Sequence, residues 1–296
     1  MKAAVLYDSS AYVTVPLKKR RNLFQVDFTL VLPNEKIIVE SVDELQLEDF
    51  FDTWMQAGTP QPKTAQPSIL DYHTAFQKII DAGYDTVFGV FLSSSVSGTF
   101  QTAQSVSQEY QDKLKIINFD AVGLSVNMEQ LIEQLVFMID ADWTFDKIKE
   151  AITKLISESR FFIALEQSDN LINGGRGKAL SRLENSSLKT RSVLEYAPGS
   201  TPILQELFRT NKQRNNYLAE IAATYQNHYS ERQIQVRIGH TLSEKKALRL
   251  KDAVQELLPN QPVEIRMIGT AFCSHLGQGA LSFGLMPVAD GVEIND

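Results

Sequence analysis

The chain has 296 residues, with 29 lysines and arginines against 36 aspartates and glutamates, which gives a formal net charge of -7. This acidic balance argues against sequence-independent nucleic-acid binding, because that activity requires a basic surface. The single cysteine, Cys273, excludes an intramolecular disulfide and a cysteine-based metal cage. The four histidines include no pair spaced four residues apart, so neither a zinc site nor another metal cofactor is expected.

The cysteine count also bears on the compartment. One cysteine in 296 residues is typical of a protein from a reducing environment, and the start MKAAVLYDSS lacks the long apolar core of a secretion signal. No run approaches the roughly 20 apolar residues that a membrane-spanning helix needs. We therefore expect a cytoplasmic protein without a membrane span.

The first half of the chain alternates short apolar runs with amphipathic segments. This pattern predicts a parallel sheet flanked by helices. We expect strands at Ala3–Tyr7, Val26–Leu32, Thr86–Leu92 and Leu114–Phe119. We expect helices over Leu47–Met55, after an N-cap at Ser68, over Met128–Ile139 and after an N-cap at Thr144.

The sequence pattern changes at the apolar run Arg160–Leu165, which is typical of a buried strand. A glycine cluster follows it at Asn173–Lys178. Beyond it we expect a helix over residues 215–229, a strand with inward Ile234, Val236 and Ile238, a helix capped by Ser243 and a strand at Val263–Ile268. The sequence therefore predicts an α/β fold with two α/β domains, residues 1–160 and 161–296.

Three clusters of small polar residues mark candidate sites, since ligands of open α/β sheets bind beyond the carboxyl ends of the strands. Asp8 and Ser9 follow the first strand, where an ordinary turn is the simpler explanation. Ser93–Thr99, with the sequence SSSVSGT, follows the strand Thr86–Leu92 and leads into a helix, so its hydroxyl and N–H groups predict either an anion site or, equally well, a simple helix cap. Thr64 lies in the extended segment KTAQPS.

A fourth candidate is His275, which lies between glycines in Gly269–Gly284. We expect this segment to be a loop that exposes the imidazole to a ligand, although a structural histidine is the simpler interpretation. The neighbouring Cys273 has no cation beside it in sequence, which favours an inert buried thiol. The chain has no GxSxG, HExxH or Walker motif.

Five of these segments together resemble the DegV family of bacterial fatty-acid-binding proteins. They are DSSAYV at residues 8–13, KTAQPS at 63–68, LSSSVSGTFQTA at 92–103, LINGGRGK at 171–178 and SHLGQGALSFG at 274–284. The resemblance implies two domains that hold one long-chain fatty acid in an apolar tunnel at or near their interface. It also implies a partner, a separate fatty-acid kinase that phosphorylates the presented carboxylate.

The resemblance assigns roles to particular residues. Thr64 and Ser94 match the two hydroxyl groups that hold the carboxylate, and His275 matches the family's histidine near the mouth. Arg176 lies in the GGR element, and Arg214 in NKQR matches a basic residue near the head group. Together with the anion cradle, the candidate ligand-binding residues are Asp8, Ser9, Thr64, Ser93, Ser94, Ser97, Gly98, Thr99, Arg176, Arg214 and His275.

Three positions depart from the family pattern. Ala65 replaces the serine of TSQPS, Gln278 replaces the proline of HxGPG, and Ala121 stands where a serine follows Asp120. The hydroxyl pair and the histidine are retained, so the sequence supports lipid binding more strongly than kinase docking.

Three hypotheses follow. The first is a non-catalytic carrier that binds a fatty acid, needs no cofactor and leaves catalysis to the kinase. The second is an enzyme that uses the Ser93–Thr99 cradle and His275 on an acyl or phosphorylated small molecule, although no nucleophile, base and orienting group can be assembled from the sequence. The third is a relative whose pocket is filled by its own aromatic side chains.

Overall fold

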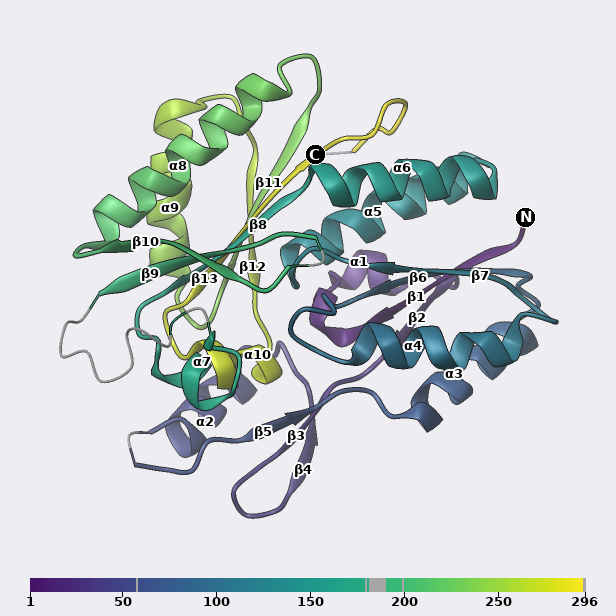
Figure 1. Cartoon of the computed structure of the whole chain (residues 1–296), viewed down its shortest axis with the longest axis horizontal. Coiled ribbons are helices and arrows are strands. Elements are labelled where there is room, and N and C mark those ends of the chain that lie inside the picture. The colour runs from purple at the N-terminus through teal and green to yellow at the C-terminus, as the bar shows by residue number, and fades with distance from the viewer. Residues whose placement is uncertain (57, 179, 181–189, 199, 295–296) are drawn as a thin grey trace.

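The computed structural model describes residues 1–56, 58–178, 180, 190–198 and 200–294 (Figure 1). The chain forms a parallel sheet, a larger mixed sheet and a small three-stranded sheet, with helices packed between and around them. The predicted α/β class, with a parallel sheet flanked by helices, is confirmed. No helix among the described residues is long and apolar enough to cross a membrane.

The first sheet has the strand order β2-β1-β6-β7, and its three pairings are parallel. Its strands are β1 (Ala3–Asp8), β2 (Leu23–Val26), β6 (Thr86–Phe91) and β7 (Lys115–Asp120). Every residue of β1 and β6 is buried, as expected for central parallel strands covered on both faces. Helices α3 (Ile69–Asp81) and α4 (Thr99–Ser107) pack on one face. The short segments η1 (Ser9–Ala11), α1 (Val15–Lys18) and η2 (Gln108–Tyr110) lie in the connections.

Two of the three predicted helix caps, Ser68 and Thr144, are confirmed. At the third, helix α9 (Glu244–Leu257) begins after Ser243 as predicted, but the serine side chain forms no capping hydrogen bond. Ser68 accepts a hydrogen bond from the Asp71 N–H, and the Asp71 side chain accepts one from the Ser68 N–H, which forms a capping box at α3. Thr144 accepts from the Lys147 N–H at the start of α6 (Phe145–Glu158). These caps satisfy N–H groups that the helix itself leaves without partners.

The second sheet has the strand order β10-β9-β8-β13-β11-β12. Its strands are β8 (Arg160–Leu165), β9 (Arg191–Tyr196), β10 (Ile203–Phe208), β11 (Ile234–His240), β12 (Val263–Met267) and β13 (Leu281–Pro287). Only the β11–β12 pairing is parallel, so this sheet is largely antiparallel. Helices α8 (Asn211–His228) and α9 (Glu244–Leu257) cover its outer face. The predicted division of the chain at residue 160 falls between the two sheets and stays a prediction.

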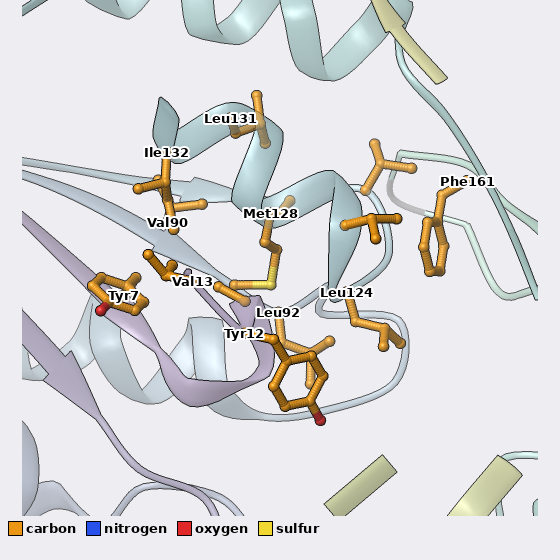
Figure 2. Packing of buried hydrophobic residues seen from close by; sticks show 14 of the residues in the cluster. Tyr7, Tyr12, Val13, Val90, Leu92, Leu124, Met128, Leu131, Ile132 and Phe161 are labelled. Atoms are coloured by element: carbon orange, nitrogen blue, oxygen red, sulfur yellow. The ribbon is translucent and has the colours of Figure 1, made fainter. Parts of the chain in front are cut away.

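Helix α5 (Val126–Asp140) lies between the two sheets and contacts β1, β6, β11 and β13. Its apolar side packs on the first sheet, where Ile132 lies beside Val90 and the Met128 side chain extends toward Val13 (Figure 2). Because α5 is apolar toward one sheet and buried by both, it joins the two sheets into one packed body.

The opposite side of α5 carries a polar stripe of Asn127, Gln130 and Gln134, all of them buried. Gln134 accepts a hydrogen bond from the Ala289 N–H at 2.8 Å and donates to the Pro287 carbonyl at 3.1 Å. Gln134 also donates to Gln235 Oε1 on β11 at 3.1 Å, so the stripe contacts both backbone and side chains of the second sheet.

The small sheet has the order β4-β3-β5, with β3 (Thr29–Val31) between β4 (Ile37–Val39) and β5 (Lys63–Ala65). Both pairings are antiparallel. The predicted single strand Val26–Leu32 is therefore wrong: β2 ends at Val26 in the first sheet, and β3 begins at Thr29 in the small one. Between them the Phe28 N–H donates to Ser9 Oγ at 2.9 Å, which fixes the change of direction. Helix α2 (Glu44–Trp54) follows β4.

The expectation of a loop over Gly269–Gly284 is also wrong. Thr270–Leu276 forms helix α10, with Gly269 as its N-cap and Gly277, at φ +73°, as its C-cap, and β13 begins at Leu281. Both glycines mark ends of this helix. Gly277 uses the positive φ that favours glycine, whereas Gly269 is extended and is required by space, because a Cβ atom there would lie 2.5 Å from Tyr12 Cε1. Helix α10 contacts the short helix α7 (Asp169–Asn173) and the small sheet.

Gly123 provides a test of the packing next to α5. Its φ is +76°, and a Cβ atom there would lie 2.1 Å from Cδ1 of the buried Phe161. We expect Gly123→Ala to lower the free energy of unfolding by about 3 kcal/mol or more, because backbone strain and overpacking add. The matched control is Gly58→Ala, which has φ +86° and open space around it; it should cost only about 1 kcal/mol. Equal losses in denaturant melts would contradict this packing.

Candidate ligand-binding site

A narrow apolar cavity lies where the loops after β6 and β7 meet β9, α7 and α10. It encloses about 480 Å³ of empty space, part of it open to solvent, but only about 40 Å³ is reachable by the centre of a water molecule. Its lining is Phe28, Leu92, Val96, Leu124, Leu171, Tyr196, Ala271, Phe272 and Leu276, with the polar residues Thr64, Ser97, Arg176 and His275. The cavity is therefore lined mainly by apolar side chains, with four polar ones among them.

The first polar element is a hydrogen bond between Thr64, on β5, and His275, on α10. Thr64 Oγ1 lies 2.9 Å from His275 Nε2, across 211 residues of sequence. His275 Nδ1 is buried and has no hydrogen-bond partner in the described part of the chain, since it lies against the backbone of Gly174. A Cβ atom at Gly174 would approach Nδ1 to 2.3 Å, so this close approach requires a glycine.

His275 is neutral at physiological pH. Burial lowers the pKa of its imidazole to about 4, and the nearby charge of Arg176 acts in the same direction. A neutral imidazole carries one N–H. If that hydrogen is on Nε2, His275 donates to Thr64, and the Thr64 hydroxyl hydrogen is left to donate into the cavity.

The loop Ser93–Thr99 is placed at the cavity but does not form the predicted cradle of free N–H groups. Backbone N–H groups of Val96 and Ser97 donate to the Ser93 carbonyl at 3.1 and 3.3 Å, and the Thr99 N–H donates to Ser97 Oγ at 3.3 Å. These groups hold the turn that leads into α4, whose N-cap is Gly98. These three N–H groups are therefore not free to bind an anion, while anion binding by the hydroxyl groups of the loop stays a prediction.

The serine hydroxyls of this loop also differ from one another. Ser94 donates from both its N–H and its hydroxyl to the Asp120 carboxylate and is not among the cavity residues. Ser93 is buried, with its hydroxyl 2.9 Å from that of Ser95. Ser97 lines the cavity, and its hydroxyl is 2.7 Å from that of Thr99. The structure therefore brings Ser97 to the same cavity as Thr64, and direct ligand contact by Ser94 stays a prediction.

Arg176 lies at the mouth of the cavity. Its side chain is exposed, with Nη1 donating to the Gly174 carbonyl at 2.8 Å and Nε to the Val96 carbonyl at 3.4 Å. These two contacts tie the guanidinium to the loops on either side. A positive charge is thus held at the solvent end of an otherwise apolar site.

The other predicted cation, Arg214, does not line the cavity. Its side chain is completely buried on α8 and pairs with Glu166 at 3.0 Å. Glu166 also pairs with Arg191 and Lys246. Arg214 is thus part of an ion-pair network of the second sheet and does not line the cavity.

Asp8 and Ser9 support the site from behind rather than lining it. Asp8 is fully buried, accepts from the Leu92 N–H at 2.7 Å and from the Ser10 N–H at 3.0 Å, and its pKa is raised to about 6 by burial. Ser9 donates to the carboxylate of Glu40. Since Leu92 lines the cavity, Asp8 fixes one of its walls.

Glu40 is a residue that sequence reasoning missed. It accepts hydrogen bonds from Ser9 and from the hydroxyl of Tyr12, and it lies beside the start of α10. Burial raises its pKa to about 7, which its two hydroxyl donors lower only in part. In the sequence it is one acid in an acidic segment, and nothing there shows that it is buried.

The single thiol of the chain belongs to Cys273, on α10. Cys273 is buried, and burial raises the pKa of its thiol well above its usual value, in agreement with the predicted inert thiol. The described residues contain no group of three or more His, Cys, Asp or Glu side chains arranged to hold a metal ion.

The fold and the cavity define an α/β protein with one narrow apolar site capped by polar side chains. The model of the family described as "Uncharacterised protein, DegV family" matches residues 2–288. The chain therefore belongs to the DegV family.

Individual relatives agree with this assignment. A DegV domain-containing protein from Streptococcus pneumoniae is 28% identical over 288 residues, which cover 97% of this chain and all of the relative. The crystal structure of a fatty-acid-binding DegV family protein from Streptococcus agalactiae is 25% identical, with a TM-score of 0.86, and covers 97% of this chain and 99% of that one. A stearic-acid-binding protein from Eubacterium ventriosum has the same fold, with a TM-score of 0.83 at 18% identity, over 98% of this chain and all of that one.

The raised pKa of Glu40 predicts a pH dependence of stability. Between its ordinary value of 4.5 and about 7, the folded state binds more protons at Glu40 than the unfolded state does. The free energy of unfolding therefore falls as pH rises through this window. Glu40→Gln removes the group that titrates. The free energy of unfolding of the variant, minus that of wild type, should therefore rise by up to about 3 kcal/mol between pH 4.5 and pH 8.

The measurement is a series of urea melts across this pH range. Glu44→Gln, an exposed acid on α2, is the control and should keep the wild-type profile. A difference between Glu40→Gln and wild type that does not change with pH would contradict the assignment.

Proposed function

We propose that the protein binds one long-chain fatty acid non-covalently in the apolar cavity, with the carboxyl group at Thr64 and Ser97. The observation that carries the proposal is the lining of the cavity. Apolar side chains form its walls, and its polar groups are two hydroxyls, a neutral imidazole and one guanidinium. An amphiphile with a long apolar chain and a single acidic head matches this distribution. The Streptococcus agalactiae relative, described as fatty-acid binding, supports the same ligand class.

The apolar chain supplies the affinity. An acyl chain of about sixteen carbons, at about 0.8 kcal/mol per buried CH₂, offers on the order of 12 kcal/mol before the costs of association. A chain of that length needs more room than the observed slot allows to a water-sized sphere, so we expect the side chains around Tyr196 and Phe272 to move apart when it enters. Binding then requires no covalent bond and no cofactor.

The polar end must satisfy the head group, because a buried carboxylate without partners is unstable. The Thr64 hydroxyl can donate to one carboxyl oxygen while His275 donates to Thr64. Ser97 can donate to the other oxygen, and Arg176 supplies opposite charge at the mouth. This set accepts an ionised or a protonated head group.

The exposure of Arg176 leads to the second part of the proposal. The head group lies at the solvent end of the cavity, where a second protein can reach it, so the bound acid is presented to a separate fatty-acid kinase in the cytoplasm. Catalysis then belongs to the partner. Ala65 and Gln278, which depart from the family pattern, do not line the cavity.

An enzymatic function is the second candidate, because a hydroxyl and an imidazole within hydrogen-bond distance also form a nucleophile and base. Two observations disfavour it. Among the described residues no group orients His275 Nδ1, and a pKa of about 4 makes the imidazole a weak base. Turnover of an acyl phosphate or ester by the isolated protein, lost in His275→Ala, would establish this candidate instead.

The direct test is to denature the purified protein and analyse the extract by mass spectrometry. We expect a fatty acid of 14 to 20 carbons at close to one per chain. A protein purified without lipid should take up an added fatty acid in the same ratio. If neither experiment gives a bound acid, fatty-acid binding is excluded, and a pocket filled by its own side chains explains the cavity.

A second test separates the two serines. We expect Ser97→Ala alone to weaken binding of a fluorescent fatty acid roughly tenfold, because a hydrogen bond to a charged group contributes about 1.5 kcal/mol or more. Ser94→Ala, whose hydroxyl donates to Asp120, should change affinity less than threefold. The opposite ranking would assign the head group to Ser94, as the family resemblance implies.

A further inference from the structure

A second surface feature lies on the far side of α10 from the ligand cavity. It is an open groove between β4 and α2, with about 1070 Å³ of space including the part open to solvent. We call it the α2–β4 groove. Its lining is Leu32, Asn34, Lys36, Ile38, Val39, Ser41, Leu45, Gln46, Asp49, Phe50, Thr53, Trp54 and Thr270.

The groove and its rim expose apolar side chains. Leu45 is 75% exposed and Val39 58%, and Ile37, two residues earlier on the same strand, is 65% exposed. β4 is an edge strand, so one side of its backbone also has no partner strand. Natural proteins blunt or cover such edges, and a cluster of exposed apolar residues beside one marks an interaction surface.

The charge around the groove has one sign. Residues 33–56 contain seven acids and one base, Lys36, so their formal charge is -6, against -7 for the whole chain. Helix α2 contributes Glu44, Glu48, Asp49 and Asp52 and contains no lysine or arginine. In the part of the chain that the structure describes, none of these four carboxylates forms an ion pair with a lysine or arginine. An apolar groove is thus bordered by unneutralised negative charge.

We propose that the α2–β4 groove docks a basic amphipathic segment of another protein. Apolar side chains of that segment fill the groove against Leu45 and Val39, and its lysines or arginines pair with the carboxylates of α2. A bilayer fits less well, because the anionic surface of a membrane repels this charge. The proposal does not depend on which ligand occupies the cavity.

Occupation of the groove also reaches the ligand site. Thr270, the first residue of α10, lines the groove, while Ala271, Phe272 and His275 on the same helix line the cavity. The Ser41 N–H donates to Thr270 Oγ1 at 3.1 Å, and the Thr270 N–H donates to the Ser41 carbonyl at 2.9 Å. A docked segment therefore touches the end of the helix that carries His275.

The test uses a synthetic peptide of alternating leucine and lysine as the probe, and the fluorescence of Trp54 as the signal. Trp143→Phe removes the only other tryptophan. We expect micromolar binding that weakens at least tenfold between 50 and 500 mM salt. A peptide with glutamate in place of lysine, and one with serine in place of leucine, should not bind.

Matched variants locate the site. We expect Leu45→Ser, and separately Glu48→Lys with Asp49→Lys, to weaken peptide binding at least tenfold. The controls are Leu257→Ser, which changes another exposed leucine, on α9, and Glu109→Lys with Asp112→Lys, which changes two exposed acids in the connection between α4 and β7; they should change peptide binding less than twofold. Equal losses in both sets would show that the peptide senses only net charge and would overturn the proposal.

The same variants also test two other possible occupants of the groove, a membrane and a second copy of this chain. Binding to phosphatidylcholine vesicles that Leu45→Ser abolishes would assign the groove to a membrane. Self-association in sedimentation experiments that Leu45→Ser abolishes would assign it to a second copy of this chain. Either result would overturn docking of a basic partner segment.

Discussion

The placement of the two sheets depends on helix α5, which is enclosed by both of them. One side of the helix packs on apolar side chains of the first sheet. The other side contacts the backbone of the second sheet and pairs with its arginines, since Glu129 lies 3.2 Å from Arg237 on β11 and Glu133 pairs with the same arginine. The backbone contact is close: a Cβ atom at Gly284 on β13 would lie 2.2 Å from Asn127 Oδ1. Apolar packing on one side and polar contacts on the other fix the separation of the sheets at one helix diameter, and the ligand cavity lies at the end of this arrangement.

The interior near the cavity disfavours charge of either sign. Burial raises the pKa values of Asp8 to about 6 and Glu40 to about 7, and it lowers that of His275 to about 4. Each shift favours the neutral form of the group. The same desolvation acts on any carboxyl group that enters the slot, while Arg176 at the mouth opposes it. A carboxyl group bound in the proposed way would therefore meet neutral donors inside and a positive charge only where solvent begins.

Local chemistry made much of the fold predictable. The caps at Ser68 and Thr144 involve residues three apart, and the central strands of the first sheet are continuous apolar runs, so neighbouring residues carry the information. The break between Val26 and Thr29 was not predictable in this way, because a hydroxyl from Ser9 fixes it. The glycines around His275 were interpreted as a loop, although they cap a helix that is itself almost wholly buried.

The site was predicted less completely for a related reason. Thr64, His275 and Arg176 were identified by their motifs, and they share one cavity. That Ser97 rather than Ser94 lines the cavity was not predictable, because it depends on Asp120, which lies 26 residues from Ser94 and accepts hydrogen bonds from both its N–H and its hydroxyl. The aromatic wall formed by Phe28 and Tyr196 carries no motif, since any large apolar residue of suitable shape can fill such a position.

The central place of β13 in the second sheet has a consequence for the order of events during synthesis. β13 is the last strand to be made, yet it lies between β8 and β11. The strands of the first sheet are complete by residue 120, so that sheet can assemble while the rest of the chain is still emerging. The second sheet must wait as two separate pieces, β10-β9-β8 and β11-β12, until residues 281–287 arrive to bridge them. A nascent chain therefore completes its second half in a single late step.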